Sequence, residues 1–267
     1  MNRITNQQIE QICALMRACG ALMLGAHSVE DRDGEITEKP GSANFVTVYD
    51  VAVQNRLIEG LKEIFPDASF LAEEKENAAA FPSQGYCFVI DPIDGTTNFI
   101  HDMRCSAISV GLFYDGAPLF GAVLDPYRDE LFSAVAGERA YLNGKPISVS
   151  GRDLPHALVS FGSSPYDREA LAEHSFAVLK NVFLACADIR RSGSAAVDIC
   201  FVACGRTDAF FEEILSPWDF AAGGIILAAA GGTITSFSGD PILPGIKSSV
   251  LCTNKQLHGA MLRLINK

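Results

Sequence analysis

The chain has 267 residues, which is enough to bury a continuous core as one large domain or two small ones. Hydrophobic residues make up 48% and charged residues 20% of it, and this composition excludes a disordered chain. The formal net charge of −11 argues against a protein that binds nucleic acid or an anionic membrane by itself, so an anionic substrate would need positive charge from another source.

Two N-terminal segments carry apolar residues at three- and four-residue steps. The first covers residues 5–26, and the second covers residues 51–64 and ends at Phe65-Pro66-Asp67. Each pattern predicts an amphipathic helix. The polar stretch between them, residues 30–44, carries many charges with Pro40 and Gly41, which indicates a loop or a hairpin.

From residue 69 onward the pattern changes to short β-rich runs separated by turn signals such as Asp115-Gly116 and Asn143-Gly144. The predicted strands are 70–72, 86–90, 107–113, 119–124 and 131–135. Since short links join consecutive strands, we expect an antiparallel sheet.

After about residue 150, predicted strands alternate with predicted helices. The strands are 157–161, 184–187 and 208–211, and the helices are 168–181, 194–204 and 218–230. This alternation favours a mostly parallel sheet covered by helices. We therefore expect two halves packed together: residues 1–150, with the helix pair and the antiparallel sheet, and residues 151–267, with α/β order.

The sequence lacks the signals of a membrane or secreted protein. No apolar run reaches the roughly 18 residues that a membrane span requires, and residues 1–10 are polar where a signal peptide would begin its apolar core. The eight cysteines are scattered through apolar segments without C-x-x-C spacing, which predicts buried, reduced thiols. We expect a cytoplasmic protein.

The motif DPIDGTTN at residues 91–98 carries the strongest chemical signal. Pro92 favours an extended Asp91, so the turn can present Asp91 and Asp94 to one side. Gly95 allows the backbone to approach a ligand, and a helical turn opened by Thr96 would offer free N–H groups to an anion. Carboxylates beside an anion site require cations between them. An ordinary turn rich in aspartate is the alternative interpretation.

Two further acidic positions extend this signal. Glu73 and Glu74 follow the predicted strand 70–72, and Asp219 lies in the first turn of an otherwise apolar predicted helix. By itself, Glu73 could be a solvated charge at a strand end and Asp219 a helix cap.

Taken together, the three signatures resemble the inositol monophosphatase family of the lithium-sensitive, Mg²⁺-dependent sugar phosphatases. They are EE at 73–74, DPIDGTTN at 91–98 and WDFAAG at 218–223, and their order and spacing match over nearly the whole chain. The resemblance implies a layered α/β/α/β/α sandwich, of the α+β or α/β class, and a metal-assisted phosphomonoesterase.

The resemblance also implies roles for single residues. Glu73, Asp91 and the carbonyl of Ile93 would bind a first Mg²⁺, and Asp91, Asp94 and Asp219 would bind a second. These donors are all oxygens, which Mg²⁺ prefers. Two or three Mg²⁺ ions per site and inhibition by Li⁺ are expected.

Asp50 and Thr96 resemble the family pair that orients and deprotonates the attacking water, so no covalent phosphoenzyme is expected. Glu212 resembles the carboxylate that accepts a hydrogen bond from a ring hydroxyl of the substrate. The substrate-binding residues that the resemblance implies are Lys39, Asp94, Gly95, Thr96, Gly193, Ser194, Ala195 and Glu212.

Substrate identity stays open between several small phosphate esters. The chain has Ala72 where the family usually has glycine, and Phe210 and Phe211 where tyrosines are common. *myo*-Inositol monophosphate is the first candidate, and histidinol phosphate, fructose 1,6-bisphosphate, NADP⁺ and 3′-phosphoadenosine 5′-phosphate are the alternatives. A nucleotide or a doubly anionic substrate would require a basic cluster or an aromatic stacking site. The sequence shows only Arg190-Arg191, which favours a small monophosphate.

The family resemblance also bears on partners. It implies a homodimer, to which the apolar stretch 93–113 could contribute. Some bacterial proteins that this chain resembles associate with the transcription machinery, so a protein-binding role is the second hypothesis. The net charge of −11 disfavours direct contact with RNA but permits a protein partner.

Overall fold

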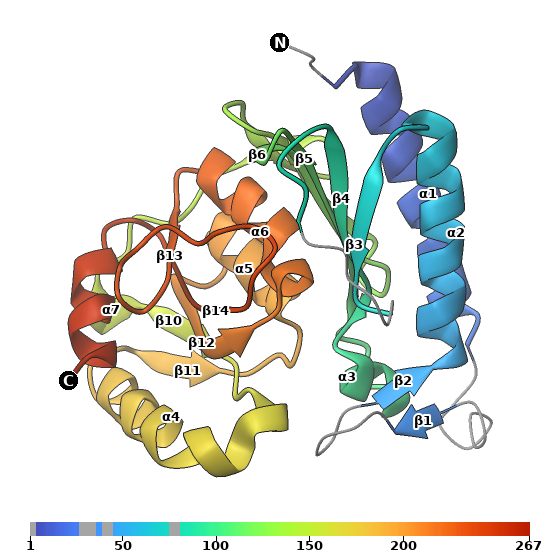
Figure 1. Ribbon diagram of the computed structural model, residues 1–267. Coiled ribbons are helices and arrows are strands. Elements are labelled where there is room, and N and C mark those ends of the chain that lie inside the picture. The colour runs from blue at the N-terminus through green and yellow to red at the C-terminus, as the bar shows by residue number, and fades with distance from the viewer. Residues whose placement is uncertain (1–3, 27–35, 39–44, 75–80) are drawn as a thin grey trace.

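The computed structural model describes residues 4–26, 36–38, 45–74 and 81–267. Within these residues, helices and sheets alternate in five layers (Figure 1). Helices α1 and α2 form one outer layer, and α5 and α6 lie between the two large sheets. Helices α4 and α7 cover the far side of the second sheet. The predicted α/β/α/β/α sandwich is therefore confirmed.

The two predicted N-terminal helices are α1 (Asn6–Leu24) and α2 (Val48–Ile64). Each begins with a capping box, in which Thr5 pairs with Gln8 and Thr47 pairs with Asp50. Their apolar faces pack on one face of the first sheet. Strands β1 (Ile36–Glu38) and β2 (Phe45–Thr47) form a short antiparallel pair directly before α2.

The first large sheet has seven strands that neighbour one another in chain order. They are β3 (Ser69–Ala72), β4 (Tyr86–Asp94), β5 (Ala107–Tyr114), β6 (Ala117–Asp125), β7 (Glu130–Val135), β8 (Ala140–Leu142) and β9 (Lys145–Ile147). The prediction of an antiparallel sheet is correct except for β3 and β4, which are parallel. Residues 73–85 connect these two strands, and a link of about a dozen residues is long enough for a parallel crossover.

The second sheet has five strands in the order β11 (Asp188–Arg190), β10 (Leu158–Phe161), β12 (Ala209–Leu215), β14 (Ser248–Thr253) and β13 (Thr233–Thr235). Strand β10 is parallel to both of its neighbours, whereas β14 is antiparallel to both of its own. The sheet is therefore mixed, and the expectation of a mostly parallel sheet is wrong.

The predicted strand 184–187 is also wrong. Helix α4 (Arg168–Phe183) ends there, and the N–H groups of Leu184 and Ala185 still donate to the helix carbonyls of Lys180 and Val182. The apolar run thus completes the last turn of α4, and the strand begins at Asp188. Strands β8, β9, β13 and β14 and the C-terminal helix α7 (His258–Ile265) were not expected from the sequence.

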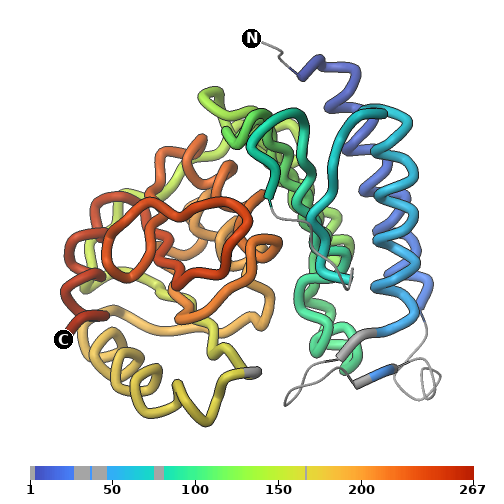
Figure 2. Tube along the Cα trace, viewed as in Figure 1, coloured from blue at the N-terminus to red at the C-terminus, as the bar shows by residue number. Residues whose placement is uncertain are grey.

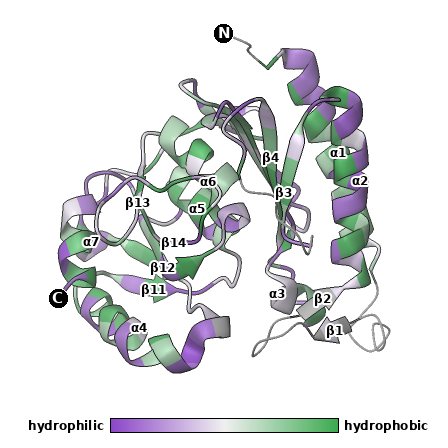
Figure 3. Ribbon diagram, viewed as in Figure 1, coloured by the Kyte–Doolittle hydropathy of each residue, from purple (hydrophilic) through white to green (hydrophobic). Residues whose placement is uncertain are grey.

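The two central helices are α5 (Ala195–Ala203) and α6 (Pro217–Ala229). Both are apolar over most of their surface, whereas α1, α2 and α4 carry polar residues as well (Figure 3). A helix that is hydrophobic all round is buried on all sides. One hydrophobic cluster accordingly joins these helices to both sheets.

The remaining helical segments are short: α3 (Thr96–Ile100) and the 3₁₀ turns Leu154–His156 and Pro165–Asp167. In Figure 2 the blue-to-green part of the chain occupies one side of the molecule and the yellow-to-red part the other. The division into halves near residue 150 stays a prediction, since the cluster between the sheets takes residues from both parts. Among the described residues, no helix has the length and apolarity to span a membrane.

Candidate active site

Three carboxylates meet where β4 ends. Asp91 and Asp94 flank an irregularity in the pairing of β4 with β5, and Asp219 lies in the first turn of α6. One carboxylate oxygen from each of the three residues lies within 4.8 Å of the other two. The first sheet and the central helix thus bring together acids that the sequence separates by more than a hundred residues.

Glu73 and the carbonyl of Ile93 complete the predicted ligand set. Glu73 follows β3, and its N–H donates to the carbonyl of Ile90 at 3.2 Å, so the parallel pairing of β3 with β4 places Glu73 near Asp91. Glu73, Asp91, Ile93, Asp94 and Asp219 line a single cavity. All five predicted ligands are therefore in one place.

The carboxylates of this cluster are buried side by side, and burial and their mutual repulsion raise their pKa values. Burial raises the pKa of Asp91 well above its usual value, and the charges of Glu73, Asp94 and Asp219 raise it further. Burial and the charges of Asp94 and Glu73 likewise raise the pKa of Asp219. Buried carboxylates that repel one another and offer only oxygen donors fit a hard divalent cation such as Mg²⁺.

Asp94 is bound to the start of α5. Its Oδ2 accepts hydrogen bonds from the hydroxyl of Ser194, which is the N-cap of the helix, and from the N–H of Ala196 at 2.7 Å. Burial raises the pKa of Asp94 to about 6, and these hydrogen bonds oppose the rise. Ser194, one of the predicted substrate contacts, therefore binds a predicted metal ligand in this structure.

Asp50 and Thr96 lie together as the sequence predicts. Asp50 is fully buried in the first turn of α2, and its Oδ2 accepts hydrogen bonds from the N–H and the hydroxyl of Thr47 at 2.7 and 2.5 Å. Thr96 Oγ1 lies 3.3 Å from Asp50 Oδ1 and 3.2 Å from the carbonyl oxygen of Ile93, and it can donate its one proton to either. The pair connects the buried end of α2 to the acidic cluster.

Gly95 follows β4 and Gly193 precedes α5, and the two glycines lie close together at the junction between this strand and this helix. Gly95 has φ +91°, a left-handed conformation that favours glycine, and a Cβ there would lie 3.1 Å from the carbonyl oxygen of Gly193. Gly193 has φ +87°. With Ala195, these residues line the cavity, but Lys39, the remaining predicted substrate contact, lies outside the described residues.

Asn98 and Asp198 form hydrogen bonds at this junction, and neither residue was expected from the sequence to have a role in the site. Asn98 Nδ2 donates to the carbonyl of Cys105 at 2.7 Å and to that of Ser192 at 2.8 Å. Asp198 Oδ2 accepts from the hydroxyl of Ser192 at 2.6 Å, and burial raises its pKa to about 7. A lone carboxylate in the apolar run of α5 was the signal that could have identified Asp198.

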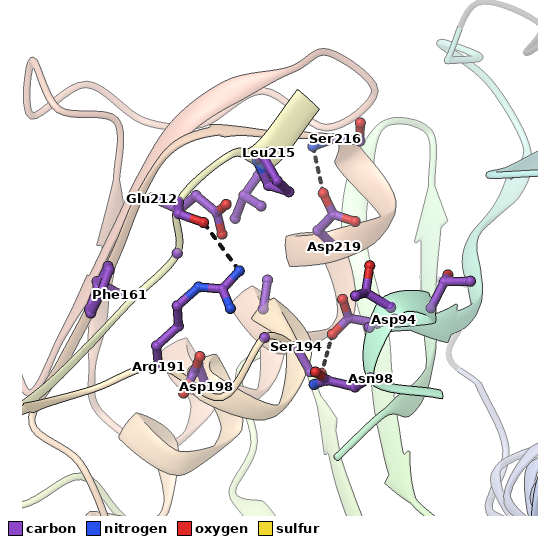
Figure 4. Close-up of a pocket in the computed structure, with 18 of the residues that line it drawn as sticks. Asp94, Asn98, Phe161, Arg191, Ser194, Asp198, Glu212, Leu215, Ser216 and Asp219 are labelled. Atoms are coloured by element: carbon purple, nitrogen blue, oxygen red, sulfur yellow. Dashed lines mark hydrogen bonds between the residues drawn. The ribbon is translucent and has the colours of Figure 1, made fainter. Parts of the chain in front are cut away.

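Glu212 lies on β12, away from the acidic cluster but in the same cavity (Figure 4). Its Oε1 accepts hydrogen bonds from the N–H of Ser164 at 2.7 Å and from the hydroxyl of Ser164 at 3.3 Å. Burial raises the pKa of Glu212 to about 7, although the positive charge of Arg191 acts in the opposite direction. Glu212 therefore lines the cavity with its carboxylate held by the N–H and the hydroxyl of Ser164.

The cavity has a volume of about 650 Å³ and reaches from the acidic cluster to helix α4. None of the α4 residues that line the cavity was expected from the sequence to belong to the site. A carboxylate cluster, an adjacent hydroxyl paired with a buried acid, and a roomy cavity are the parts that metal-assisted hydrolysis of an ester requires.

Comparison with known proteins agrees with this geometry. The sequence profile of the inositol monophosphatase family matches residues 5–267. The chain is 38% identical over 215 residues to the Nus factor SuhB of *Pasteurella multocida*, covering 80% of each protein. It is 36% identical over 225 residues to the inositol-1-monophosphatase of *Synechocystis* sp., covering 84% of this chain and 77% of that protein.

Among solved structures, the inositol monophosphatase of *Anabaena* (*Nostoc*) sp. superposes with a TM-score of 0.83 at 33% identity. The match covers 98% of this chain and 97% of the other. The similarity therefore extends over both sheets and all the layers described above.

Proposed function

Because the chain belongs to the inositol monophosphatase family, we propose that it is a Mg²⁺-dependent phosphomonoesterase that hydrolyses *myo*-inositol monophosphate or a similar small polyol phosphate. Family membership supports phosphatase activity. The observation that carries the proposal is the meeting of Asp91, Asp94 and Asp219 within 4.8 Å beside Thr96, in one cavity.

The donor set fits Mg²⁺, because every donor is a carboxylate or carbonyl oxygen. Glu73, Asp91 and the Ile93 carbonyl would hold one ion, and Asp91, Asp94 and Asp219 would hold a second. When bound, such ions supply the positive charge that binds a phosphate and lower the pKa of water.

Thr96 and Asp50 would prepare the attacking water. With its proton donated to Asp50 Oδ1, Thr96 Oγ1 keeps its lone pairs for a hydrogen bond from water. Thr96 would thus orient the water and receive its proton, while Asp50 takes the proton of the threonine hydroxyl. Since water itself attacks the phosphorus, no covalent phosphoenzyme is required.

The remaining predicted contacts would bind the substrate. Gly95, Gly193 and Ala195 line the cavity beside the acidic cluster and would lie against the phosphate, as would Lys39 by family resemblance. Glu212 would accept a hydrogen bond from a ring hydroxyl of the alcohol part.

Asp91→Asn tests the proposal directly. Loss of one carboxylate shared by both metal positions should lower Mg²⁺-dependent kcat at least about a hundredfold. Circular dichroism should show an unchanged fold, because Asn fits the same space. Asp67→Asn, an exposed acid at the end of α2, is the matched control. Near wild-type turnover in Asp91→Asn would refute the two-metal assignment.

The substrate is identified by a separate measurement, in which the turnover of each candidate ester by the wild type is compared.

We also propose that Li⁺ inhibits the enzyme at millimolar concentrations, as the family resemblance implies. The measurement is the rate at fixed Mg²⁺ over a Li⁺ titration, with K⁺ as the control salt. An unchanged rate would contradict this proposal.

A homodimer and a cytoplasmic location are further proposals. The segment 93–113 carries Met103, which is 65% exposed and could contribute to a subunit contact. Light scattering that gives a monomer mass would contradict the dimer. All eight cysteines are free thiols, which supports a reducing compartment.

A second function is favoured by the similarity to the Nus factor SuhB. In this alternative the chain binds a protein of the transcription machinery. Capture of partners by the wild type and by Asp91→Asn distinguishes the roles. Partner binding that survives the loss of turnover would support the second role, and absence of any partner would leave catalysis as the function.

A further inference from the structure

Asp198 is a buried carboxylate that the proposed metal ligand set does not use. It lies on α5, which is otherwise apolar, and it is only 3% exposed. Within the part of the chain that the structure describes, Asp198 belongs to no ion pair. Burial of an unpaired carboxylate is unfavourable, and alanine or leucine would form the same helix more readily. The packing of α5 therefore does not explain why an aspartate occupies this position.

The partner of Asp198 is Ser192, in the turn before α5. Ser192 Oγ lies 2.6 Å from Asp198 Oδ2, the short distance of a hydroxyl that donates to a carboxylate. The same Oγ lies 3.0 Å from the carbonyl oxygen of Ser194 and accepts a hydrogen bond from the N–H of Ser194 at 3.0 Å. Because a hydroxyl has one proton, the shorter contact with the charged acceptor assigns that proton to Asp198. The lone pairs of Ser192 Oγ then remain for the N–H of Ser194.

The main chain of Ser192 is held from another side. Asn98, on α3, donates through Nδ2 to the carbonyl of Ser192 at 2.8 Å. The side chain of Ser192 is bound by α5 and its carbonyl by α3. Both contacts together fix the turn of residues 192–194.

This turn leads directly to a proposed metal ligand. The hydroxyl of Ser194 donates to Asp94 Oδ2, and the N–H of Ala196 donates to the same oxygen at 2.7 Å. In Figure 4, Ser194 lies between Asp198 and Asp94. A continuous series of hydrogen bonds therefore runs from Asp198 through Ser192 and Ser194 to Asp94.

We propose that Asp198 is a positioning residue, which holds Ser194 through Ser192 and thereby fixes the direction of Asp94 in the acidic cluster. The inference rests on the proposed function for the role of Asp94 and adds the residue that keeps Asp94 aligned. Hydrogen-bond partners behind a metal ligand orient that ligand, and their loss weakens metal binding. The series requires an acceptor oxygen at residue 198. An amide oxygen provides one, whereas a methyl group does not.

The first test measures the turn in the metal-free protein, without substrate. Hydrogen exchange at the N–H of Ala196 should be about tenfold faster in Asp198→Ala than in the wild type, because the turn beside it opens more often. The N–H of Gly162 donates to the carbonyl of Phe211 at 2.9 Å on another wall of the same cavity, and its exchange rate should not change. Equal acceleration at Ala196 and Gly162 would indicate a general loss of stability and refute the proposal.

The second test measures the binding of Mg²⁺ by calorimetry and kcat on inositol monophosphate. Asp198→Ala should weaken Mg²⁺ binding about tenfold and lower kcat about tenfold. Asp198→Asn keeps the acceptor oxygen and should stay within about twofold of the wild type in both measurements. Asp188→Ala is the matched control, because Asp188 lies on β11 before the same turn and pairs with Arg190 outside the cavity. This control should change neither value.

Ser192→Ala tests whether Asp198 acts through Ser192. It should weaken Mg²⁺ binding as much as Asp198→Ala does. The double variant should bind Mg²⁺ no more weakly than either single variant, since both substitutions remove the same link. Additive losses would show that the two residues act independently and would contradict the series.

The exchange measurement separates this proposal from the proposed function. If the wild type hydrolyses no ester, or binds no Mg²⁺, the exchange rate at Ala196 still decides whether Asp198 holds the turn. An unchanged rate in Asp198→Ala would refute the positioning role. A rate in Asp198→Asn as fast as that in Asp198→Ala would also refute it, because the acceptor oxygen would then have no effect.

Discussion

At the scale of single residues, the site is built from carboxylates that the fold holds in buried surroundings, where a negative charge is energetically unfavourable. Asp91, Asp94 and Asp198 are almost completely buried, and burial raises the pKa of each one. A buried charge without a partner is expensive, so such residues usually serve a binding or catalytic purpose. Asp198 lies outside the proposed ligand set, and its contribution to stability can therefore be tested separately.

Asp198 should make the metal-free protein less stable as the pH rises. Its pKa is about 7 in the folded chain, above the ordinary value near 4 of the unfolded chain. Between these two values the folded state binds a proton that the unfolded state has lost, so the free energy of unfolding falls with rising pH and levels off above about pH 7. Asp198→Asn should remove this pH-dependent fall in the free energy of unfolding, while the amide oxygen still accepts a hydrogen bond from the hydroxyl of Ser192.

The measurement is urea unfolding of both proteins in a chelator at pH 5 and pH 8. The free energy of unfolding of the wild type should fall between the two pH values by about 2 kcal/mol more than that of Asp198→Asn. Parallel changes in the two proteins would show that Asp198 keeps an ordinary pKa.

Replacement of Glu212 should lower kcat/KM for inositol monophosphate much more than kcat/KM for a simple ester. A charged hydrogen bond to a ring hydroxyl contributes about 1.5–3 kcal/mol, so Glu212→Gln should lower kcat/KM about ten- to a hundredfold. *p*-Nitrophenyl phosphate has no such hydroxyl and should be almost unaffected. Steady-state rates on both esters check this expectation.

The neighbouring Glu213 provides the matched control. Its carboxylate binds His174 and Ser175, at 2.7 and 2.6 Å, instead of Ser164. Glu213→Gln should therefore leave the ratio of the two esters unchanged. An equal loss on both esters in Glu212→Gln would mean that Glu212 acts through the fold or the acidic cluster.

At the scale of elements, the turn before α5 joins the two sides of the site. Asn98 holds the carbonyl of Ser192, and Ser194 binds Asp94. The position of α5 relative to β4 therefore depends on a few contacts within this turn. Close packing here leaves no space for a side chain at Gly193, where a Cβ would lie 2.9 Å from Asn98 Nδ2.

Gly193→Ala should lower kcat more than tenfold, because the displaced Asn98 and Ser194 no longer align Asp94. Gly231→Ala is the control, since Gly231 has φ +88°, close to the φ of +87° at Gly193, but nothing within 4 Å of the added Cβ. Both variants should lose about 1 kcal/mol of stability from the left-handed backbone, as measured by urea unfolding.

Only Gly193→Ala should lose activity beyond this shared loss of stability. If the two variants lose activity equally, backbone strain alone explains the effect, and the contact between Gly193 and Asn98 has no catalytic importance.

At the scale of the whole molecule, the acidic cluster lies between two sheets that share one core. Asp219 belongs to α6, which contacts strands of both sheets, and Asp91 belongs to the first sheet. A cation bound between these residues joins the two sides of the molecule and relieves the repulsion of their charges. Binding to the folded state alone stabilises a protein by mass action.

Saturating Mg²⁺ should therefore raise the Tm of the metal-free protein by about 5–10 °C, which corresponds to about 2.7 kcal/mol at a hundredfold excess over Kd. Asp91→Asn should show less than a third of this increase. Thermal unfolding with Mg²⁺, and with K⁺ at matched ionic strength, gives the comparison. The same increase with K⁺ would mean general screening of charge and no specific site.

Much of the local structure could be predicted from the sequence. The helices at 5–26, 51–64, 168–181, 194–204 and 218–230 follow from hydrophobic periodicity and caps, and the structure confirms them. The wrong strand at 184–187 has the same origin, because a short apolar run has no period that distinguishes a strand from the last turn of a helix. The parallel pairing of β3 with β4 depends on which strands neighbour one another, and no local pattern encodes this.

The sequence by itself predicted the chemistry of the site, because Asp91, Asp94, Gly95 and Thr96 lie within six consecutive residues at the end of β4 and the start of α3. Only the tertiary structure decided which other side chains line the cavity around these residues. Sheet order and helix packing bring Arg168, Lys247 and Phe176 to the same cavity from positions that no spacing rule connects. Contacts between distant segments depend on the packing of whole elements, and for that reason the breadth of the cavity became visible only in the folded chain.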